Sequence, residues 1–420
     1  MTPYLQHNTR FPPQIYARPS INLGIIVVIP AYDEDYLLLS LMALQKCERP
    51  SCDVEVIVVL NDSEKDKLEI REKHIAQAAQ IREWAGKFRR NGIRFHVIYQ
   101  DHLPRKYAGV GFARKIGMDE ACWRFEKLGN PQGIIACFDA DSRCEVNYLC
   151  ALEAHFSQHP DCQAASIYFE HPLHGPDFED DVYAAIVDYE LHLRYYINAQ
   201  RFAGFPFAYQ TIGSSMAVRC KAYQQQGGMN RRKAGEDFYF IHKFTPLGHL
   251  GEINSTRVIP SPRPSHRVPF GTGRAVGQLL ASKKCYETYA PASFLDLKAL
   301  FEAVPILFEW KEGANSFVHT LPESIQSFLL AADFEQKLAE IRTHTTHLVT
   351  FRNRFFRWFN AFQLMKYLHF ARDHYYPEID VHQAATWLLV QKGEIEAQQQ
   401  LTNKELLLIY RKLDRAGVST

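Results

Sequence analysis

Short hydrophobic runs alternate with longer amphipathic stretches through the first half of the chain. Runs that stop abruptly at polar residues are typical of buried strands. The strands predicted in this way are residues 25–29, 54–60, 94–99 and 134–138. Helices are predicted at residues 36–44, 64–90, 108–128 and 147–158. The alternation predicts the α/β class, with a doubly wound, mostly parallel sheet flanked by helices.

The second half of the chain has a different pattern. Strands are expected at residues 164–169 and 215–219, with a long helix at 182–198 between them. From about residue 274 onward the pattern is predominantly helical, which predicts a separate region. The expected domains are an N-terminal lead-in over residues 1–21, a sheet domain over 22–275 and a helical C-terminal region over 276–420.

Composition narrows the class of protein. Of the 420 residues 46% are hydrophobic, and the formal net charge is +1, so no basic field favours nucleic acid. The nine cysteines contain no C-x-x-C pair, which disfavours a zinc ribbon. Several of them lie inside apolar runs, as reduced core cysteines do, which indicates a reducing compartment. No apolar run approaches the roughly 18 residues that a membrane helix needs. We expect a cytoplasmic protein.

Two aspartates follow the predicted strand at residues 134–138. Asp139 and Asp141 are two residues apart, so on an extended chain their side chains point the same way. Two carboxylates this close repel each other unless a cation lies between them, and oxygen ligands suit Mg²⁺ or Mn²⁺. This pattern indicates a metal site just beyond the carboxyl end of a strand, which is where open α/β sheets bind ligands. A solvated turn that ends the strand is the alternative.

Polar and aromatic residues also follow the first two predicted strands. Such groups at neighbouring strand ends can hold a nucleoside, through ring stacking and hydrogen bonds to the base or ribose. Helix capping and ordinary loop chemistry are the alternative, and on these residues alone the favoured one. The candidate nucleotide-binding residues are Pro30, Ala31, Tyr32 and Glu34 after the first strand, and Asn61 and Asp62 after the second.

Several cations have the spacing of an anion site. Lys106 and Arg114 lie near the start of the predicted helix 108–128, where positive charge suits a diphosphate, although solvated surface positions fit equally well. Residues 261–274 form a Pro- and Gly-rich segment with three arginines, among them Arg267, which could cover an anionic leaving group. His266 in the same segment is a candidate third metal ligand; simple exposure is the more common state of a loop histidine.

Glu236 and Asp237 begin a short apolar helix. As acidic residues in a first turn they complement the helix dipole. The functional interpretation makes Asp237 a general base, whose carboxylate accepts the proton of an attacking hydroxyl.

Four blocks in this order resemble those of the family 2 glycosyltransferases of the GT-A fold, over about residues 22–275. The sequence V-I-P-A-Y-D-E at 28–34 is similar to the opening strand motif, and A-R-K-I-G at 113–117 to a helix block usually written A-R-N-x-G. Asp139-Ala140-Asp141 is similar to the D-x-D metal site, and Gly227-Gly228 with Glu236-Asp237 to the G-G…E-D block on the acceptor side. Lys115 and Asn61 depart from the family pattern, and the Q-x-x-R-W block of processive synthases is absent.

The resemblance implies a metal-dependent, inverting, non-processive glycosyltransferase, which moves a sugar from a nucleotide-diphosphate donor to an acceptor hydroxyl. It implies that Asp237, beside Glu236, is the catalytic base and that Asp139 and Asp141 hold Mg²⁺ or Mn²⁺. The acceptor would be a glycan, a lipid-linked molecule or a small molecule. Two alternatives stay open: a scaffold that binds nucleotide or glycan without turnover, and, less favoured, a sugar-1-phosphate nucleotidyltransferase.

One C-terminal stretch bears on location. Residues 351–370 combine several aromatic residues with Arg352, Arg354, Arg357 and Lys366. An aromatic and basic amphipathic helix can lie on an anionic membrane, which would place the protein at its inner face. Docking of the aromatic face on the protein's own domain is the alternative, and the favoured one.

Overall fold

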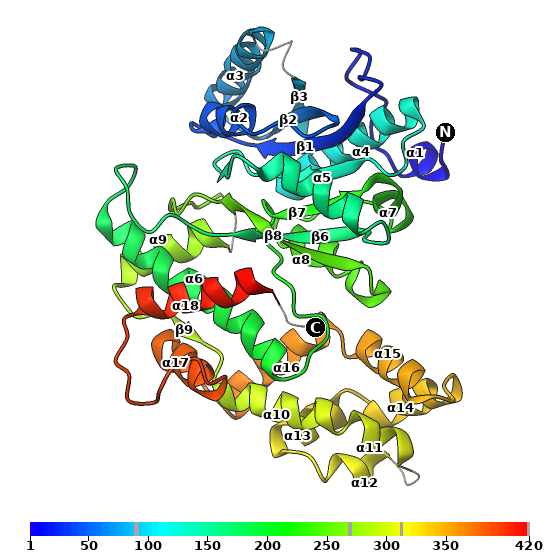
Figure 1. The fold of residues 1–420 in the computed structure, drawn as a ribbon, viewed down its shortest axis with the longest axis vertical. Coiled ribbons are helices and arrows are strands. Elements are labelled where there is room, and N and C mark those ends of the chain that lie inside the picture. Colours follow the sequence, from blue (N-terminus) through cyan, green and yellow to red (C-terminus); the bar gives the residue numbers. More distant parts are fainter. Residues whose placement is uncertain (88–91, 268–270, 311–313, 418–420) are drawn as a thin grey trace. The chain divides into compact units, whose positions relative to one another are not determined.

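The chain divides into two compact units in the computed structural model, which describes residues 1–87, 92–267, 271–310 and 314–417 (Figure 1). Unit 1 comprises Met1–Gly175, Thr211–Arg274 and Asp414–Thr420, and unit 2 comprises Pro176–Gln210 and Ala275–Leu413. The division differs from the expected domain ranges. Residues 176–210 group with the C-terminal helices because the long helix α6 (Asp180–Phe202) packs against helices of unit 2.

Unit 1 is built on one eight-stranded sheet, in the order β3-β2-β1-β4-β7-β6-β8-β5. Its strands are β1 (Leu23–Ala31), β2 (Asp53–Ser63), β3 (Ile93–Leu103), β4 (Ile134–Cys137), β5 (Arg143–Cys144), β6 (Ala164–Phe169), β7 (Met216–Arg219) and β8 (Leu250–Ile259). The pairs β1–β2, β1–β4, β2–β3 and β6–β8 are parallel, while β7 runs antiparallel between β4 and β6, and β5 antiparallel to β8. The predicted mostly parallel α/β sheet is confirmed.

Both faces of this sheet are covered by helices. Ile25, Val27 and Ile29 of β1 belong to one buried cluster, whereas Ile26 and Val28 belong to a second cluster. The first cluster includes residues of α2, α3 and α5, and the second includes residues of α1, α4, α7 and α8. The helices are α1 (Pro3–His7), α2 (Leu37–Gln45), α3 (Leu68–Gly86), α4 (Val110–Leu128), α5 (Tyr148–Gln158), α7 (Cys220–Gln225), α8 (Glu236–Ile241) and the 3-10 turn η1 (Thr245–Leu247). The end of the helix predicted at 64–90 falls on residues 88–90, outside the described residues.

The N-terminal lead-in packs on α4 of unit 1. The Tyr4 hydroxyl donates to Asp119 at 2.8 Å and accepts from Lys115 Nζ at 2.8 Å. Lys115 also forms an ion pair with Asp119 at 2.9 Å, and all three side chains are buried. Lys115, which departs from the family pattern, therefore has a structural partner set in this chain.

Unit 2 is helical apart from two short antiparallel strands, β9 (Glu287–Thr288) and β10 (Ile379–Asp380). Its core is rich in aromatic rings, since Phe205 and Phe356 both pack on Phe301, at centroid distances of 5.8 Å and 5.2 Å. Besides α6, its helices are α10 (Pro291–Glu302), α11 (Val304–Glu309), α12 (Ala314–Val318), α13 (Glu323–Ala331), α14 (Phe334–Thr343), α15 (Leu348–Trp358), α16 (Ala361–His374) and α17 (Val381–Gln391). Two further helices, α9 (Thr272–Ser282) and α18 (Asn403–Ala416), each begin in one unit and end in the other. The expected helical C-terminal region is confirmed.

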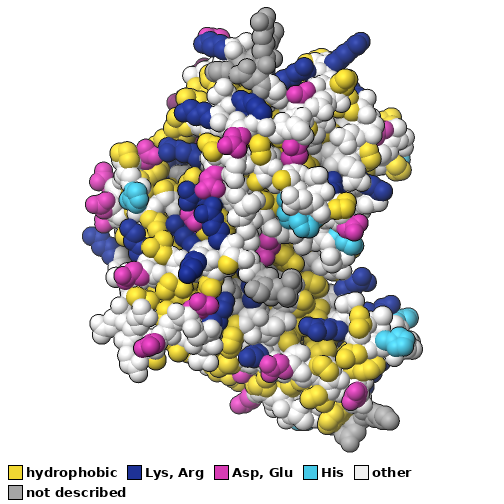
Figure 2. All heavy atoms as spheres, viewed as in Figure 1, with side chains coloured by type: hydrophobic (Ala, Val, Ile, Leu, Met, Phe, Trp, Pro, Cys, Tyr) yellow, Lys and Arg dark blue, Asp and Glu magenta, His cyan; other side chains and the backbone are white. Residues whose placement is uncertain are grey.

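The stretch 351–370, expected as one helix that could lie on a membrane, is divided between two helices, because α15 ends at Trp358 and Asn360 caps the start of α16. Helix α15 buries its aromatic face within unit 2. Phe351, Phe355 and Phe359 have no exposed surface, while Arg352 and Arg354 are exposed. The aromatic face of α15 therefore docks on the other helices of unit 2. Within the described ranges, no helix has both the length and the apolar character needed to cross a membrane. Basic and acidic side chains are interspersed on the face drawn in Figure 2, in keeping with the small net charge.

Candidate active site

The end of β1 makes a sharp turn at one edge of the sheet. Asp33 has a positive φ of 46°, which is rare for a residue with a side chain. Lys73 of α3 bonds to both Asp33 and Asp35, each at 2.6 Å, and so fixes the turn. Burial, followed by the neighbouring Asp66, raises the pKa of Tyr32 to about 12.

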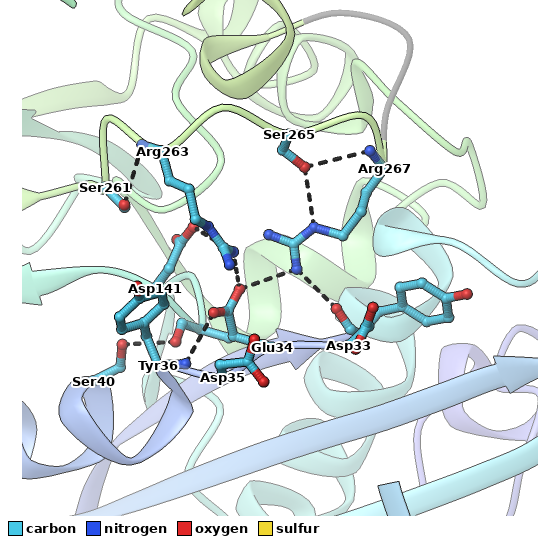
Figure 3. Close-up of polar contacts among 12 residues, drawn as sticks. Asp33, Glu34, Asp35, Tyr36, Ser40, Asp141, Ser261, Arg263, Ser265 and Arg267 are labelled. Carbon is cyan, nitrogen blue, oxygen red and sulfur yellow. Dashed lines mark hydrogen bonds and ion pairs between the residues drawn. The ribbon is translucent and has the colours of Figure 1, made fainter. Parts of the chain in front are cut away.

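Two arginines from the segment after β8 converge on Glu34 at this turn (Figure 3). The Glu34 side chain is 2% exposed and forms ion pairs with Arg263 and, at 3.0 Å, with Arg267. Arg267 also donates to the carbonyl of Tyr32 at 2.8 Å. Arg263 lies 3.6 Å from Asp141, so this segment joins the ends of β1 and β4.

Asp139 and Asp141 lie in the turn that follows β4. The Ser40 hydroxyl of α2 donates to the carbonyl of Ala140 at 2.8 Å, and the Ser142 N–H donates to the carbonyl of Asp139 at 3.1 Å, so the turn is held in place. Burial, together with the charges of Asp139 and Glu34, raises the pKa of Asp141 to about 7. The charged form of Asp141 is therefore disfavoured, first by burial and then by the two neighbouring carboxylates.

Arg114 of α4 connects the β4 turn with α8. Its guanidinium is 3% exposed and bonds to Asp139 through one terminal nitrogen and to Glu236 through the other. Gly213 makes room for it, since a Cβ there would lie 2.5 Å from the guanidinium nitrogens. Burial opposes the charge of Arg114, but the carboxylates of Asp139 and Glu236 raise its pKa above the ordinary value. Arg114 stays charged, and both of its terminal nitrogens are engaged by protein carboxylates.

Helix α8 presents two adjacent carboxylates. It starts after Gly235, whose φ of 68° lies in the left-handed region that favours glycine. Burial, followed by the charge of Asp237, raises the pKa of Glu236 to about 7, although Arg114 opposes the shift. Burial also raises the pKa of Asp237, whose carboxylate accepts the Phe238 N–H at 2.7 Å.

These contacts gather five carboxylates and three guanidinium groups into one cluster. The carboxylates are those of Glu34, Asp139, Asp141, Glu236 and Asp237, and the guanidinium groups are those of Arg114, Arg263 and Arg267. Negative charge exceeds positive charge, and the paired oxygen donors of Asp139 and Asp141 fit a hard divalent cation. Among the described residues no three His, Cys, Asp or Glu side chains form a ready metal site. His266 therefore forms no such group with the two aspartates; its ring is exposed, and its Nδ1 lies 3.4 Å from a terminal nitrogen of Arg274. Residues 268–270 of this loop are outside the described part of the chain.

Other predicted site residues have different surroundings. Asp62 lies inside β2 rather than beyond it and is fully buried, with its oxygens accepting from the Tyr99 hydroxyl at 2.5 Å and the His102 N–H at 3.0 Å. Asn61 beside it is buried, as are Pro30 and Ala31 at the end of β1. Lys106 is exposed and lies 4.7 Å above the Tyr107 ring. These residues are not direct partners of Asp139 or Asp141 in the described structure.

Two partners of the site were not among the predicted site residues. Arg263 pairs with Glu34, 229 positions away, and Lys73 pairs with Asp33. The arginines of residues 261–274 were the only sequence signal for the first pairing. No local pattern in α3 marks Lys73, which is one of many charged residues in that helix.

No family model matches the chain, and neither does any curated protein. Several solved structures align with the chain at low sequence identity. One is S. aureus TarS 1–349 in complex with UDP-GlcNAc, at 15% identity over 80% of this chain and 92% of that chain, with a TM-score of 0.41. Another is GalNAc-T7 with UDP, GalNAc and Mn²⁺, at 15% identity over 68% of this chain and 51% of that chain, with a TM-score of 0.37. Such loose alignments do not locate individual residues, so the site is defined by this chain's own contacts.

Proposed function

We propose that the protein is a GT-A-like, family 2-like glycosyltransferase, which transfers a sugar from a nucleotide-diphosphate donor to an acceptor hydroxyl with inversion. The observation that supports this most is the Arg114 bridge between Asp139 and Glu236. It brings the carboxylates after β4 and the carboxylates of α8 into one site, although they are distant in sequence. The transfer reaction needs both groups within reach of one sugar.

The donor end of the site is formed by the turns after β1 and β4. Tyr32 and the buried end of β1 would contact the nucleoside, and the guanidinium groups of Arg263 and Arg267 would bind the diphosphate. Asp139 and Asp141 would hold Mg²⁺ or Mn²⁺, which supplies positive charge for the leaving diphosphate. Arg114 is only 3% exposed, whereas Arg263 and Arg267 are 20% and 32% exposed, so the diphosphate would contact those two arginines rather than Arg114.

The acceptor end is formed by α8. Asp237 would accept the proton of the acceptor hydroxyl as that oxygen attacks the anomeric carbon, and the carbon–oxygen bond to the diphosphate breaks on the opposite face. A raised pKa strengthens Asp237 as a base, since its carboxylate binds a proton more firmly than an ordinary aspartate. Glu236 fixes the position of Asp237 through its bond to Arg114.

The test compares the wild type with Asp237→Asn in transfer from a panel of nucleotide sugars with Mn²⁺ or Mg²⁺. The variant should lose about 10²–10⁴-fold in kcat, because the general base is gone, while the thermal shift caused by the donor persists. Asp181→Asn is a matched control, because Asp181 also lies in the first turn of a helix and should leave kcat unchanged. Unimpaired transfer by Asp237→Asn would exclude Asp237 as the base. A donor-induced thermal shift with no turnover of any donor would favour the binding-scaffold alternative.

A further inference from the structure

A cluster of cations borders the acceptor end of the site without carboxylate partners. It comprises five side chains, all exposed, which we call the basic cluster: Arg105, Lys106, Arg231, Arg232 and Lys233. In the described part of the chain none of the five forms an ion pair, whereas other arginines of unit 1, such as Arg114 and Arg263, are paired with acids. In a protein with a net charge of +1, five unpaired cations on two neighbouring segments are a concentrated positive field.

Two segments that are distant in sequence form this cluster. The Arg231 guanidinium lies 5.2 Å and Lys106 Nζ lies 4.7 Å from the ring centre of Tyr107. The Arg232 guanidinium lies 3.6 Å above the ring of Tyr239 in α8. These cation–π contacts favour the observed positions of Lys106, Arg231 and Arg232 and leave their N–H groups without acid partners. The cations around Tyr107, with Lys106 first, also lower the pKa of its hydroxyl.

The same segments touch the start of α8. A Cβ on Gly111 would lie 2.3 Å from the carbonyl oxygen of Arg232 and 3.0 Å from Cβ of Glu236, so the first turn of α4, the basic cluster and α8 are packed together. Asp237 is the next residue after Glu236 and follows Lys233 by four positions. The cluster is therefore at the Glu236–Asp237 end of the site, whereas Arg263 and Arg267 are at the Glu34 end.

We propose that the acceptor is a phosphate ester, whose phosphate binds the basic cluster while its hydroxyl is directed to Asp237. This inference rests on the proposed transferase function, because only that function makes the bound phosphate ester an acceptor. Several cations together fit a multiply charged anion better than a single carboxylate, and guanidinium groups bind phosphate oxygens in pairs. The phosphate would come from a soluble ester or from a lipid headgroup, which present the same chemistry to the cluster.

The test measures binding and transfer with matched pairs of acceptors, glycerol against sn-glycerol 3-phosphate and glucose against glucose 6-phosphate. At low ionic strength the phosphorylated member should bind at least about tenfold more tightly and have a correspondingly higher kcat/KM, and added salt should reduce the preference. In Arg231→Gln/Arg232→Gln/Lys233→Gln the preference should fall to about twofold or less. A control with the same change in net charge is Lys46→Gln/Lys67→Gln/Lys127→Gln, which removes exposed lysines that form no ion pair with any described residue and should keep the wild-type preference.

A second arm compares vesicles of phosphatidylcholine with vesicles that contain phosphatidylglycerol. Preference for the soluble esters, or for the anionic vesicles, supports the proposal and identifies the source of the phosphate. Equal use of phosphorylated and unphosphorylated acceptors, or an unchanged preference in the triple variant, overturns it while leaving the transferase function intact. Phosphate-dependent binding without any sugar transfer instead overturns the acceptor role and the proposed function together. If the triple variant does not fold, the preference of the wild type and its salt dependence still decide the question.

Discussion

The buried guanidinium of Arg114 offers the sharpest test of how the site is assembled. Arg114→Met keeps much of the side-chain volume and removes the charge that Asp139 and Glu236 share. Removing one member of a buried ion pair costs about 3–5 kcal/mol of unfolding free energy, because the other charge stays buried without a partner. Glu236 is 4% exposed and carries most of this cost, whereas Asp139 is 35% exposed and is partly screened by solvent. We expect a loss of about 3 kcal/mol at pH 8.

The loss should depend on pH with a definite sign. Burial already raises the pKa of Glu236 to about 7, above the ordinary value of 4.5, and removal of Arg114 raises it further. The folded variant therefore binds a proton at Glu236 that the unfolded chain lacks, so the stabilisation contributed by this group is fully present below its ordinary pKa of 4.5 and is lost as pH rises through the folded-state pKa. The difference from the wild type should be larger at pH 8 than at pH 6. Adding Glu236→Gln should restore at least half of the loss, because no buried charge then remains at that position.

The assay is urea unfolding followed by circular dichroism at both pH values, for the wild type, Arg114→Met, Glu236→Gln and the double variant. Arg114→Lys is the matched control, since it keeps the charge but cannot hold two carboxylates at once. A loss of less than about 1 kcal/mol in Arg114→Met, or a double variant less stable than Arg114→Met, would refute the bridge as the link between the two ends of the site.

Three further predictions concern the scaffold. Burial lowers the pKa of His192 to about 4, so between about pH 6.5 and pH 4 the unfolded chain takes up a proton that the native state does not. The native state therefore loses stability over this range, and His192→Gln should reduce that loss in an acid unfolding titration. Phe355 has no exposed surface, and Phe355→Ala should cost about 3–5 kcal/mol in urea unfolding; a cost below 1 kcal/mol would mean that α15 is not docked in its unit. Gly213→Ala should displace the Arg114 guanidinium and lower kcat, whereas Gly86→Ala, whose added Cβ meets no atom of the described residues within 4 Å, should not.

The pattern of the sequence predicted the sheet because most of its strands are buried on both faces. In β1, Ile25 through Ile29 have no exposed surface, and such continuous apolar runs stand out in a sequence. The strand β8 was not predicted, since its residues alternate irregularly between buried and exposed and include Asn254, Ser255 and Arg257. The helix α1 within the lead-in was also not predicted. Its short sequence docks through Tyr4, a contact that local periodicity does not encode.

The site was predictable where its residues follow strands or begin helices, as Asp139, Asp141, Glu236 and Asp237 do. The links between these groups were not predictable, because they depend on pairs that the fold brings together. Arg114 looked equally suited to a phosphate or to solvent, and its two carboxylate partners lie on other elements. Asp62 looked like a strand-end ligand, but β2 extends to Ser63 and buries it with Tyr99.

The configuration of the product's anomeric carbon tests the central mechanism most directly. The wild type is incubated with a nucleotide sugar that it turns over and an acceptor, and the first product is examined by proton NMR before any equilibration. Direct attack by a hydroxyl that Asp237 deprotonates predicts inversion, so an α-linked donor yields a β-linked product. A product that retains the donor's configuration would contradict single displacement and the role of Asp237 in it.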